Sequence, residues 1–350
     1  MRPLFLLILF VAFSLPRFGF SQADTVVVPV EDKQAAEKIY NDGIRLYDKG
    51  ELRQALAKFN DAISLKPDLW NAYYNRGVVK SDLDDFQGAI DDFTKVITNN
   101  PTALAYYGRA RAKHELNDLG GALTDYSFAI EKDNMMHMAY YYRGSVFFEQ
   151  KEYQQAIDDY TNAIASQKDF AYAYNDRGSA YKMINDEDKA IQNYKEAVRL
   201  DPKLALSYNN MGSVYKKQNK HKEAIIEYSK AVDIDPEYYI AYNNRGIVKY
   251  DSGDLKGAID DFSKAISINP QYAYAYNNRG NAYYKLKEYD NAIKDLNKAI
   301  ELNPDYGYAY LNRGNVKEMQ RKDAEACEDW KKATSLGVTS ADIYSKSICN

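Results

Sequence analysis

The feature that most constrains this chain is a 34-residue repeat that runs through most of its 350 residues. Every step between units is 34 residues except the 33-residue step from Gly77 to Ala110. Each unit is marked by one small residue, Gly43 in the first. An Ala stands twelve residues after each marker, and a large apolar residue stands four residues after that Ala, from Phe59 in the first unit to Trp330 in the last. Such a period predicts stacked copies of one small structural unit. A small residue marks the same place in nine successive units: Gly43, Gly77, Ala110, Gly144, Gly178, Gly212, Gly246, Gly280 and Gly314.

The small residues and the rings predict that each unit is a pair of helices. Gly and Ala let two antiparallel helices approach closely, and the large apolar side chain fills the space that remains. Proline closes six units, at 67, 101, 202, 236, 270 and 304. It cannot continue the second helix of a unit but is accepted in the first turn of the next. Because one pair cannot bury its own apolar face, neighbouring pairs must stack.

A period of 34 with small residues at these offsets resembles the tetratricopeptide repeat over residues 36–340. The resemblance implies an all-α, right-handed superhelical solenoid of nine helix pairs, closed by a short capping helix in residues 341–350. With Ala36 as position 1 of the first repeat, each marker is position 8. The family implies that the first helix of each pair lines a concave surface through positions 2, 5, 6, 9, 12 and 13. Proteins of this family usually hold an extended peptide on that surface.

The first residues have the pattern of a secretory signal peptide. Arg2 precedes an apolar run from Leu4 to Phe13, and small residues follow at Ser21 and Ala23. We expect a signal peptide in residues 1–23, cleaved after Ala23 or after Ser21, and a linker in residues 24–35. The run is too short for a membrane span, which requires about 20 apolar residues. The sequence therefore predicts an exported protein, of the periplasm or cell envelope or secreted, with no membrane span in the mature chain.

Composition and motifs argue against nucleic acid binding and against catalysis. The net charge is −4 and the chain has no run of Lys or Arg, so we expect no nucleic acid partner. The three histidines are scattered, and no metal-binding, phosphate-binding or nucleophile motif is present. We therefore expect no metal, no cofactor and no enzymatic activity. The 33 tyrosines suit half-buried surfaces and recognition sites instead.

Position 7 of the repeat, usually apolar in the family, is Arg in seven units, and position 23 is Asp in six. Every unit with this Asp has the Arg. The first unit reverses the signs, with Asp42 and Lys58. The reversal predicts an ion pair between the two helices of each unit, with a structural rather than a ligand-binding role. The predicted pairs include Arg76 with Asp92, Arg143 with Asp159, Arg245 with Asp261, and Arg279 with Asp295.

Asparagine recurs at positions 5 and 6, although helices do not favour this residue. An amide offers a donor and an acceptor together, so a row of amides can bond an extended backbone whatever its side chains are. Similar rows line the tetratricopeptide domain of the enzymes that glycosylate Ser and Thr, and the resemblance is to their binding groove alone. Two other interpretations stay open: the amides bond to neighbouring helices or water, or they bind glycans together with tyrosine rings. The predicted peptide-binding residues are Asn41, Asn75, Asn175, Asn209, Asn210, Asn243, Asn244, Asn277, Asn278 and Asn312.

The asparagines are interrupted in the third and fourth repeats, where Tyr107, Tyr141, Tyr142 and Phe148 stand at inner positions. We expect an aromatic subsite for an apolar anchor there, and local repacking is the alternative. Charge along the predicted surface is also uneven. The early repeats place mainly acids on it, whereas the later ones place Lys182, Lys216, Lys217 and Lys285 against Asp176, Asp251 and Glu318. Such asymmetry could orient a bound chain, and the alternative is ordinary variation of the surface.

Cys327 and Cys349 are the only cysteines. In an exported protein they can pair, and the alternative is a buried thiol at Cys327 with a free one in the tail. The repeats resemble bacterial examples, and bacterial repeat proteins with an ending similar to ACEDWKKA often carry a last cysteine in the tail. This resemblance predicts a Cys327–Cys349 disulfide. It would close a loop of about 20 residues.

These observations predict a non-catalytic scaffold that binds an extended protein segment in its concave groove. The alternatives are a self-assembling structural subunit of a cell-envelope complex, for which a homo-oligomer is expected, and a glycan-binding module. Self-assembly predicts concentration-dependent oligomers, and glycan binding predicts saccharide affinity that depends on the groove tyrosines.

Overall fold

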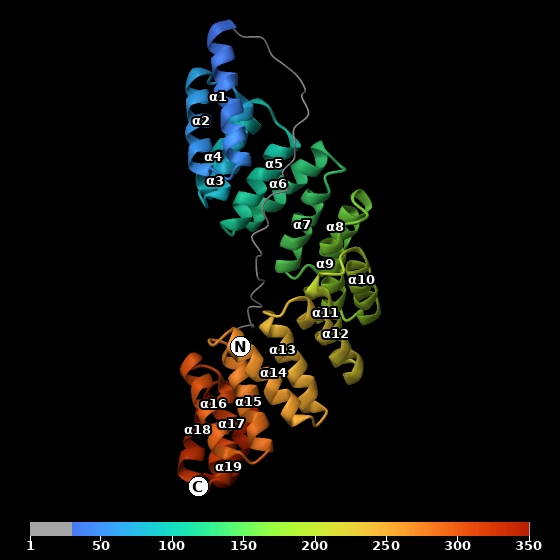
Figure 1. Ribbon diagram of the computed structural model, residues 1–350, viewed down its shortest axis with the longest axis vertical. Coiled ribbons are helices and arrows are strands. Elements are labelled where there is room, and N and C mark those ends of the chain that lie inside the picture. Colours follow the sequence, from blue (N-terminus) through green and yellow to red (C-terminus); the bar gives the residue numbers. More distant parts are fainter. Residues whose placement is uncertain (1–29, 350) are drawn as a thin grey trace. The chain divides into compact units, whose positions relative to one another are not determined.

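The computed structural model describes residues 30–349, and the regular structure of that part of the chain consists of nineteen α-helices. Figure 1 shows them as consecutive pairs along the chain. The all-α class and the helix pairing predicted from the period are confirmed. The predicted signal peptide, residues 1–23, lies outside the described residues.

The chain divides into two compact units between Lys168 and Asp169. The helices of the first unit are α1 (Val30–Asp48), α2 (Leu52–Leu65), α3 (Trp70–Asp82), α4 (Phe86–Asn99), α5 (Ala103–Glu115), α6 (Leu119–Lys132), α7 (His137–Glu149) and α8 (Tyr153–Ser166). Those of the second unit are α9 (Ala171–Met183), α10 (Glu187–Leu200), α11 (Ala205–Lys217), α12 (His221–Ile234), α13 (Tyr239–Asp251), α14 (Leu255–Ile268), α15 (Ala273–Lys285), α16 (Tyr289–Leu302), α17 (Gly307–Met319), α18 (Asp323–Ser335) and α19 (Thr339–Ile348).

Within each unit an odd-numbered helix packs against the helix that follows it, and that helix packs against the next pair. Successive odd-numbered helices also contact one another, as α11 does with α13. The first helix begins at Val30, so the predicted linker 24–35 is wrong for residues 30–35, which are helical. Their sequence, VEDKQA, contains several good helix formers, which explains the earlier start.

A short turn joins the two helices of each pair and is defined by two neighbouring residues. Asn117 takes a left-handed conformation (φ 60°), which Asn tolerates better than most residues. The Asp118 side chain then accepts a hydrogen bond of 2.9 Å from the Gly121 backbone N–H and caps α6. In the second unit Gly253 and Asp254 form the same turn before α14.

The core lies between the helices of each pair and between adjacent pairs. The nine large apolar residues of the repeat are at most 2% exposed: Phe59, Phe93, Tyr126, Tyr160, Tyr194, Tyr228, Phe262, Leu296 and Trp330. The marker glycines lie directly against them. A Cβ at Gly246 would be 2.7 Å from the Phe262 ring, closer than such contacts allow. The small residue is therefore required by close helix approach.

The last helix, α19, covers the end of the second unit. It starts at Thr339, and it packs against α18. The rings of Trp330 and Tyr344 stack with centroids 5.3 Å apart. The Cys327–Cys349 disulfide joins the end of this helix to α18, with a Cα–Cα distance of 5.5 Å.

Candidate functional site

The predicted peptide-binding asparagines of the second unit lie on its odd-numbered helices, but they are not equivalent. At position 5 the four side chains are buried, with exposed fractions of 1–7%. Buried amides cannot reach an extended chain lying on the surface. For Asn175, Asn209, Asn243 and Asn277 the prediction of direct peptide contact is therefore wrong, and their role is to bond to neighbouring helices.

The asparagines at position 6 bond back to these buried amides. Asn244 Nδ2 donates to Asn209 Oδ1 of the preceding repeat at 3.0 Å. The same bond joins Asn210 to Asn175 at 3.2 Å, Asn278 to Asn243 at 3.0 Å, and Asn312 to Asn277 at 2.8 Å. Each repeat of this series is thus tied to the next through two asparagines. We call Asn210, Asn244, Asn278 and Asn312 the amide row; all four side chains are half-buried.

The amide row keeps part of its hydrogen-bonding capacity. A carboxamide has two N–H donors and an acceptor oxygen, and the contact with the preceding repeat uses one donor. Within residues 30–349, the side chains of Asn244 and Asn312 have no further hydrogen bond. Asn278 Oδ1 accepts a long bond of 3.2 Å from Asn277. A partly exposed asparagine that keeps a second N–H donor beyond its bond to the preceding repeat therefore recurs once per repeat.

The two predicted asparagines of the first unit differ from the amide row. Asn75 Nδ2 donates to the Tyr40 hydroxyl at 2.7 Å, so a tyrosine at position 5 takes the place of the buried asparagine. Asn41 is exposed, at the start of the array. The amide pattern is therefore continuous only in the second unit.

The predicted aromatic subsite is mainly a packed cluster in the first unit. Tyr107 is 7% exposed, so it cannot line an open pocket, and the prediction is wrong for this residue. Its ring lies 6.0 Å from Tyr142 and 6.1 Å from Tyr126, measured between centroids. The Arg111 guanidinium lies 4.7 Å from the centroid of the Tyr142 ring, a cation–π contact. The interruption of the asparagines thus reflects local repacking around a half-buried arginine.

Tyr141 and Phe148, the other members of the predicted subsite, are half-buried. The Tyr141 ring contacts Tyr142 and Tyr160, with centroids 5.2 and 5.7 Å away. The Phe148 ring packs edge-on against Tyr153 at 5.4 Å. Part of each ring is exposed, but both are engaged in packing within the unit.

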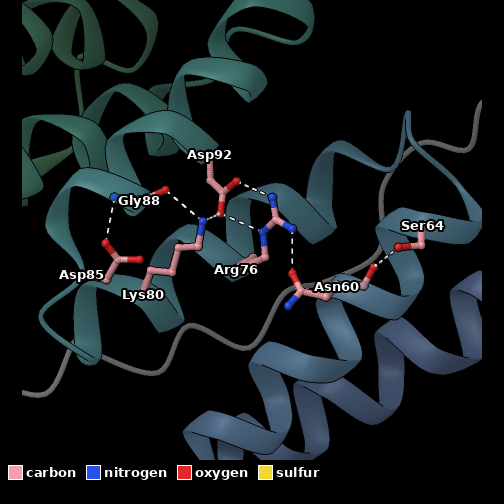
Figure 2. A network of polar contacts seen from close by, with 7 residues as sticks. All are labelled: Asn60, Ser64, Arg76, Lys80, Asp85, Gly88 and Asp92. Atoms are coloured by element: carbon pink, nitrogen blue, oxygen red, sulfur yellow. Dashed lines mark hydrogen bonds and ion pairs between the residues drawn. The ribbon is translucent and has the colours of Figure 1, made fainter.

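The structure brings every predicted Arg–Asp pair together. Arg76 donates from Nε and Nη2 to the two carboxylate oxygens of Asp92, at 2.8 and 2.6 Å (Figure 2). This bidentate arrangement is the strongest that Arg makes with a carboxylate. The Asp side chains are at most 6% exposed and the Arg side chains at most 20%. The same geometry is found in Arg109–Asp125, Arg143–Asp159, Arg245–Asp261, Arg279–Asp295 and Arg313–Asp329.

Each of these arginines also reaches the preceding repeat. Arg76 Nη1 donates to Asn60 Oδ1 on α2 at 2.7 Å (Figure 2). In the second unit Arg245 and Arg279 bond in the same way to the hydroxyls of Ser229 and Ser263. We call this set of contacts the arginine clamp. It joins three helices, two of its own repeat and one of the repeat before.

Sequence reasoning missed the acceptor on the preceding repeat and two further contacts around the clamp. Lys80 Nζ lies 2.8 Å from Asp92 Oδ2, so this carboxylate has two cations (Figure 2). Lys113, Lys249 and Lys317 repeat the contact. The Arg side chain also lies over the Tyr three residues before it, as Arg76 does over Tyr73 at 5.1 Å. The signal was present, because Lys occurs four residues after the Arg only in repeats that have the Asp.

Repeats without the Arg–Asp pair show what replaces it. Arg177 Nε donates to Asn193 Oδ1 at 2.8 Å, so an amide substitutes for the carboxylate. In the first repeat the inferred partner of Asp42 was Lys58, and this is wrong: Asp42 pairs with Arg45 on its own helix. Arg45 is one turn away and largely exposed, so the pair forms locally rather than across the helices.

Burial raises the pKa of Asp159 above its ordinary value, although Arg143 lies beside it. The repeat of Asp159 has Phe147 at the place where four other repeats have the second cation. At this carboxylate the effect of burial outweighs the single guanidinium, and the neighbouring Asp158 adds to the rise.

Among residues 30–349, no three or more His, Cys, Asp or Glu side chains are arranged to hold a metal ion. No helix of that part of the chain is long and apolar enough to cross a membrane.

Comparisons with known proteins agree with this architecture. The model of the tetratricopeptide repeat matches residues 273–306, and that of the ETO1 C-terminal domain matches residues 30–276. Mouse tetratricopeptide repeat protein 36 is 35% identical over 72 residues, which are 21% of this chain and 39% of that protein. The chain thus spans well under two thirds of that relative.

Two solved structures share the fold. A tetratricopeptide repeat protein from Parabacteroides merdae is 20% identical, with a TM-score of 0.56 over 70% of this chain and 98% of its own. The Cut9–Hcn1 hetero-tetramer of the APC/C contains a chain that is 15% identical, with a TM-score of 0.58 over 90% of this chain and 76% of its own. The protein therefore belongs to the tetratricopeptide repeat family and, over residues 30–276, to the family of the ETO1 C-terminal domain.

Proposed function

We propose that the protein is a non-catalytic scaffold that holds an extended segment of a partner protein against the amide row. A protein–protein interaction scaffold fits the family to which the chain belongs. The amide row carries the finer proposal, because a partly exposed carboxamide recurs once per repeat over four consecutive repeats. Such a row can bond to the backbone of an extended chain without selecting its side chains.

The anchoring of Asn210, Asn244, Asn278 and Asn312 strengthens this proposal. Each amide is fixed by its bond to the preceding repeat, so little side-chain entropy remains to be lost when a peptide binds. The buried asparagines at position 5 then have a supporting role. They orient the row and do not touch the peptide.

The test compares two triple variants against peptides selected from a random display library of twelve-residue segments. Asn210→Ala, Asn244→Ala and Asn278→Ala together remove most of the row. Asn209→Leu, Asn243→Leu and Asn277→Leu remove its supports and leave the row amides in place. We expect the first variant to lose at least tenfold in affinity for the selected peptides, and the second to lose clearly less.

Circular dichroism and thermal unfolding check that both variants are folded at the temperature of the binding assay, and affinities are compared only where they are. Selected peptides that bind the first variant as tightly as the wild type would exclude the row as the binding site. A library that yields no peptide would contradict the proposal as a whole.

The place of action is a further part of this proposal. We propose that the protein is exported, on the basis of the apolar run and small residues at its start. Intact mass spectrometry of the protein from its native host should find a chain that begins at Asp24 or at Gln22. An uncleaved chain would contradict export by this route.

A further inference from the structure

An apolar row borders the amide row on the same helices. Leu206, Ile240, Tyr274 and Tyr308 each stand four residues before a member of the amide row, and residues four apart share one face of a helix. Leu206 is 40% exposed and Tyr308 is 58% exposed, and the other two are half-buried. The edge beside the amides is therefore apolar and accessible along four repeats.

The end of the amide row next to α9 carries the cation Lys182, with Asp176 six residues before it on the same helix. Lys182 on α9 donates from Nζ to the Ser213 hydroxyl on α11 at 3.3 Å, and Ser213 in turn donates to the backbone carbonyl of Asn210. The Lys182 ammonium is therefore linked through Ser213 to the backbone of Asn210, the first member of the row. In the part of the chain that the structure describes, no carboxylate lies within 4 Å of this ammonium.

The charge of Lys182 is not compensated by its surroundings. Burial lowers the pKa of Lys182, and nearby Lys217 lowers it further. Lys217 itself is paired with Glu187 at 2.9 Å. A half-buried cation with only a hydroxyl partner is an unfavourable arrangement that an acidic ligand would relieve. Lys216 adds a second cation on α11, whereas the opposite end of the row, on α17, has Glu318.

The spacing of the helices sets the period of a bound chain. Successive odd-numbered helices contact one another, and packed helices lie about 8–10 Å apart. An extended chain rises about 3.3 Å per residue, so one repeat corresponds to about three residues of the partner. A side chain at every third residue can then lie on the apolar row.

We infer that the occupant of the amide row is an extended protein segment with an acidic residue held by Lys182, followed by apolar residues at every third position along α11 to α17. This inference rests on the proposed function and adds the chemistry of the partner and its placement. The carboxylate meets the uncompensated ammonium, the backbone meets the amides, and the apolar side chains cover Leu206, Ile240 and their equivalents.

The probe is a synthetic twelve-residue peptide with Asp first, Leu at every third residue after it and Ser elsewhere, carrying a fluorescent label. One control peptide replaces the Asp by Asn, and another has the same composition with Leu at every second residue. Fluorescence anisotropy gives the Kd for each. We expect at least tenfold weaker binding of both controls, because a charge-assisted bond or the alignment of the apolar side chains is lost.

The matched variant is Lys182→Met, which keeps an unbranched side chain of similar length. It should bind the Asp and Asn peptides equally, at the weaker affinity of the Asn peptide on the wild type. Equal binding of the Asp and Asn peptides to the wild type would overturn the role of the carboxylate. Equal binding of the two leucine periods would overturn the three-residue spacing.

Failure of this inference can be told apart from failure of the proposed function. If library peptides require Asn210, Asn244 and Asn278 but share neither an acidic residue nor the three-residue pattern, the inference fails while the proposed function stands. If they do not require these asparagines, both fail.

Discussion

At the scale of single residues, the arginine clamp shows how one side chain can serve two repeats. Its guanidinium satisfies a buried carboxylate on its own repeat and a hydroxyl or amide on the repeat before. A buried Asp without a cation destabilises the folded state, so removing the Arg should lower the free energy of unfolding. The clamps differ in one respect that experiments can use: within residues 30–349, some carboxylates have a second cation within 4 Å and others do not.

Arg279→Met should destabilise the second unit by about 3–5 kcal/mol, because in the described part of the chain Asp295 keeps no other cation within 4 Å. Arg245→Met is its matched control. There Lys249 still lies 2.8 Å from Asp261, so we expect a smaller loss, of about 1.5–3 kcal/mol. Both arginines also bond to a serine of the preceding repeat, so the loss of that hydrogen bond is common to the two variants and does not affect the difference between them. Urea unfolding followed by circular dichroism gives the two values, and equal losses would contradict the role of the second cation.

Asp159 should make the stability of the first unit depend on pH. Its pKa in the folded state is raised by burial, with Arg143 opposing and Asp158 adding to the rise. A raised pKa means that the folded state binds the proton more tightly than the unfolded chain. The stabilisation that Asp159 gains by binding its proton in the folded state is therefore fully present below the unfolded pKa of about 3.8. It is lost as pH rises through the folded pKa.

Asp159→Asn tests this pH dependence. An amide already faces the arginine in the repeat of Asn193, so the replacement has a precedent in this chain. We expect the stability of the variant relative to the wild type to increase as pH rises from about 3.8 through the folded pKa. Asp261→Asn, at a carboxylate with two cations, should instead lose stability at neutral pH. Urea unfolding over a pH series measures both, and a difference independent of pH would refute the prediction for Asp159.

At the scale of elements, the odd-numbered helices of the second unit are joined by bonds between asparagines. A buried acceptor on one helix meets a donor from the next, and leaving that acceptor unpaired costs more than the bond itself contributes. The last repeat shows that the buried position can also be apolar, because Leu311 stands there and is 9% exposed. The two positions should therefore respond differently to substitution.

Asn278→Ala should destabilise by about 1–3 kcal/mol, because it leaves the buried Oδ1 of Asn243 without a donor. Asn277→Leu should cost less than about 1 kcal/mol, since its partner Asn312 is half-buried and water can replace the lost acceptor. The free energies of unfolding by urea decide between them. A larger loss of unfolding free energy for Asn277→Leu than for Asn278→Ala would contradict the view that an unpaired buried acceptor is the main cost.

At the scale of the whole molecule, the period alone predicted the helix pairs, their core and the residues that make it. The residue types at Gly246 and Phe262 are predictable, because the helices approach closely there and only a small residue fits against the ring. The amides were harder to place. Positions 5 and 6 are adjacent in sequence, and only the distance to the neighbouring helix shows that Asn243 is buried and Asn244 is not. The aromatic cluster around Tyr107 was misplaced for the same reason.

The disulfide should stabilise the end of the second unit and little else. Closing a loop with a sequence separation of 22 residues contributes about 3 kcal/mol. In an array, each repeat contacts only its neighbours, so the effect decays along the chain. Hydrogen exchange of the Cys327→Ser, Cys349→Ser double variant should show lost protection in α18 and α19, with α9 to α11 unchanged. A uniform loss would show that the unit opens as a whole.

The arginine clamp has a consequence for how such a chain can grow or shrink. Each Arg takes one partner from its own repeat and another from the repeat before. The residues that one clamp joins therefore span the boundary between two sequence repeats. Inserting or deleting one whole period anywhere between Ser229 and Ser263 restores an equivalent acceptor for the next arginine. The 33-residue step between the second and third repeats shows how much variation in length a clamp tolerates, because Arg109 still donates to Thr94 there at 3.1 Å. Insertions and deletions in the array are therefore constrained to lengths close to one period, since each arginine must meet an acceptor on the repeat before it.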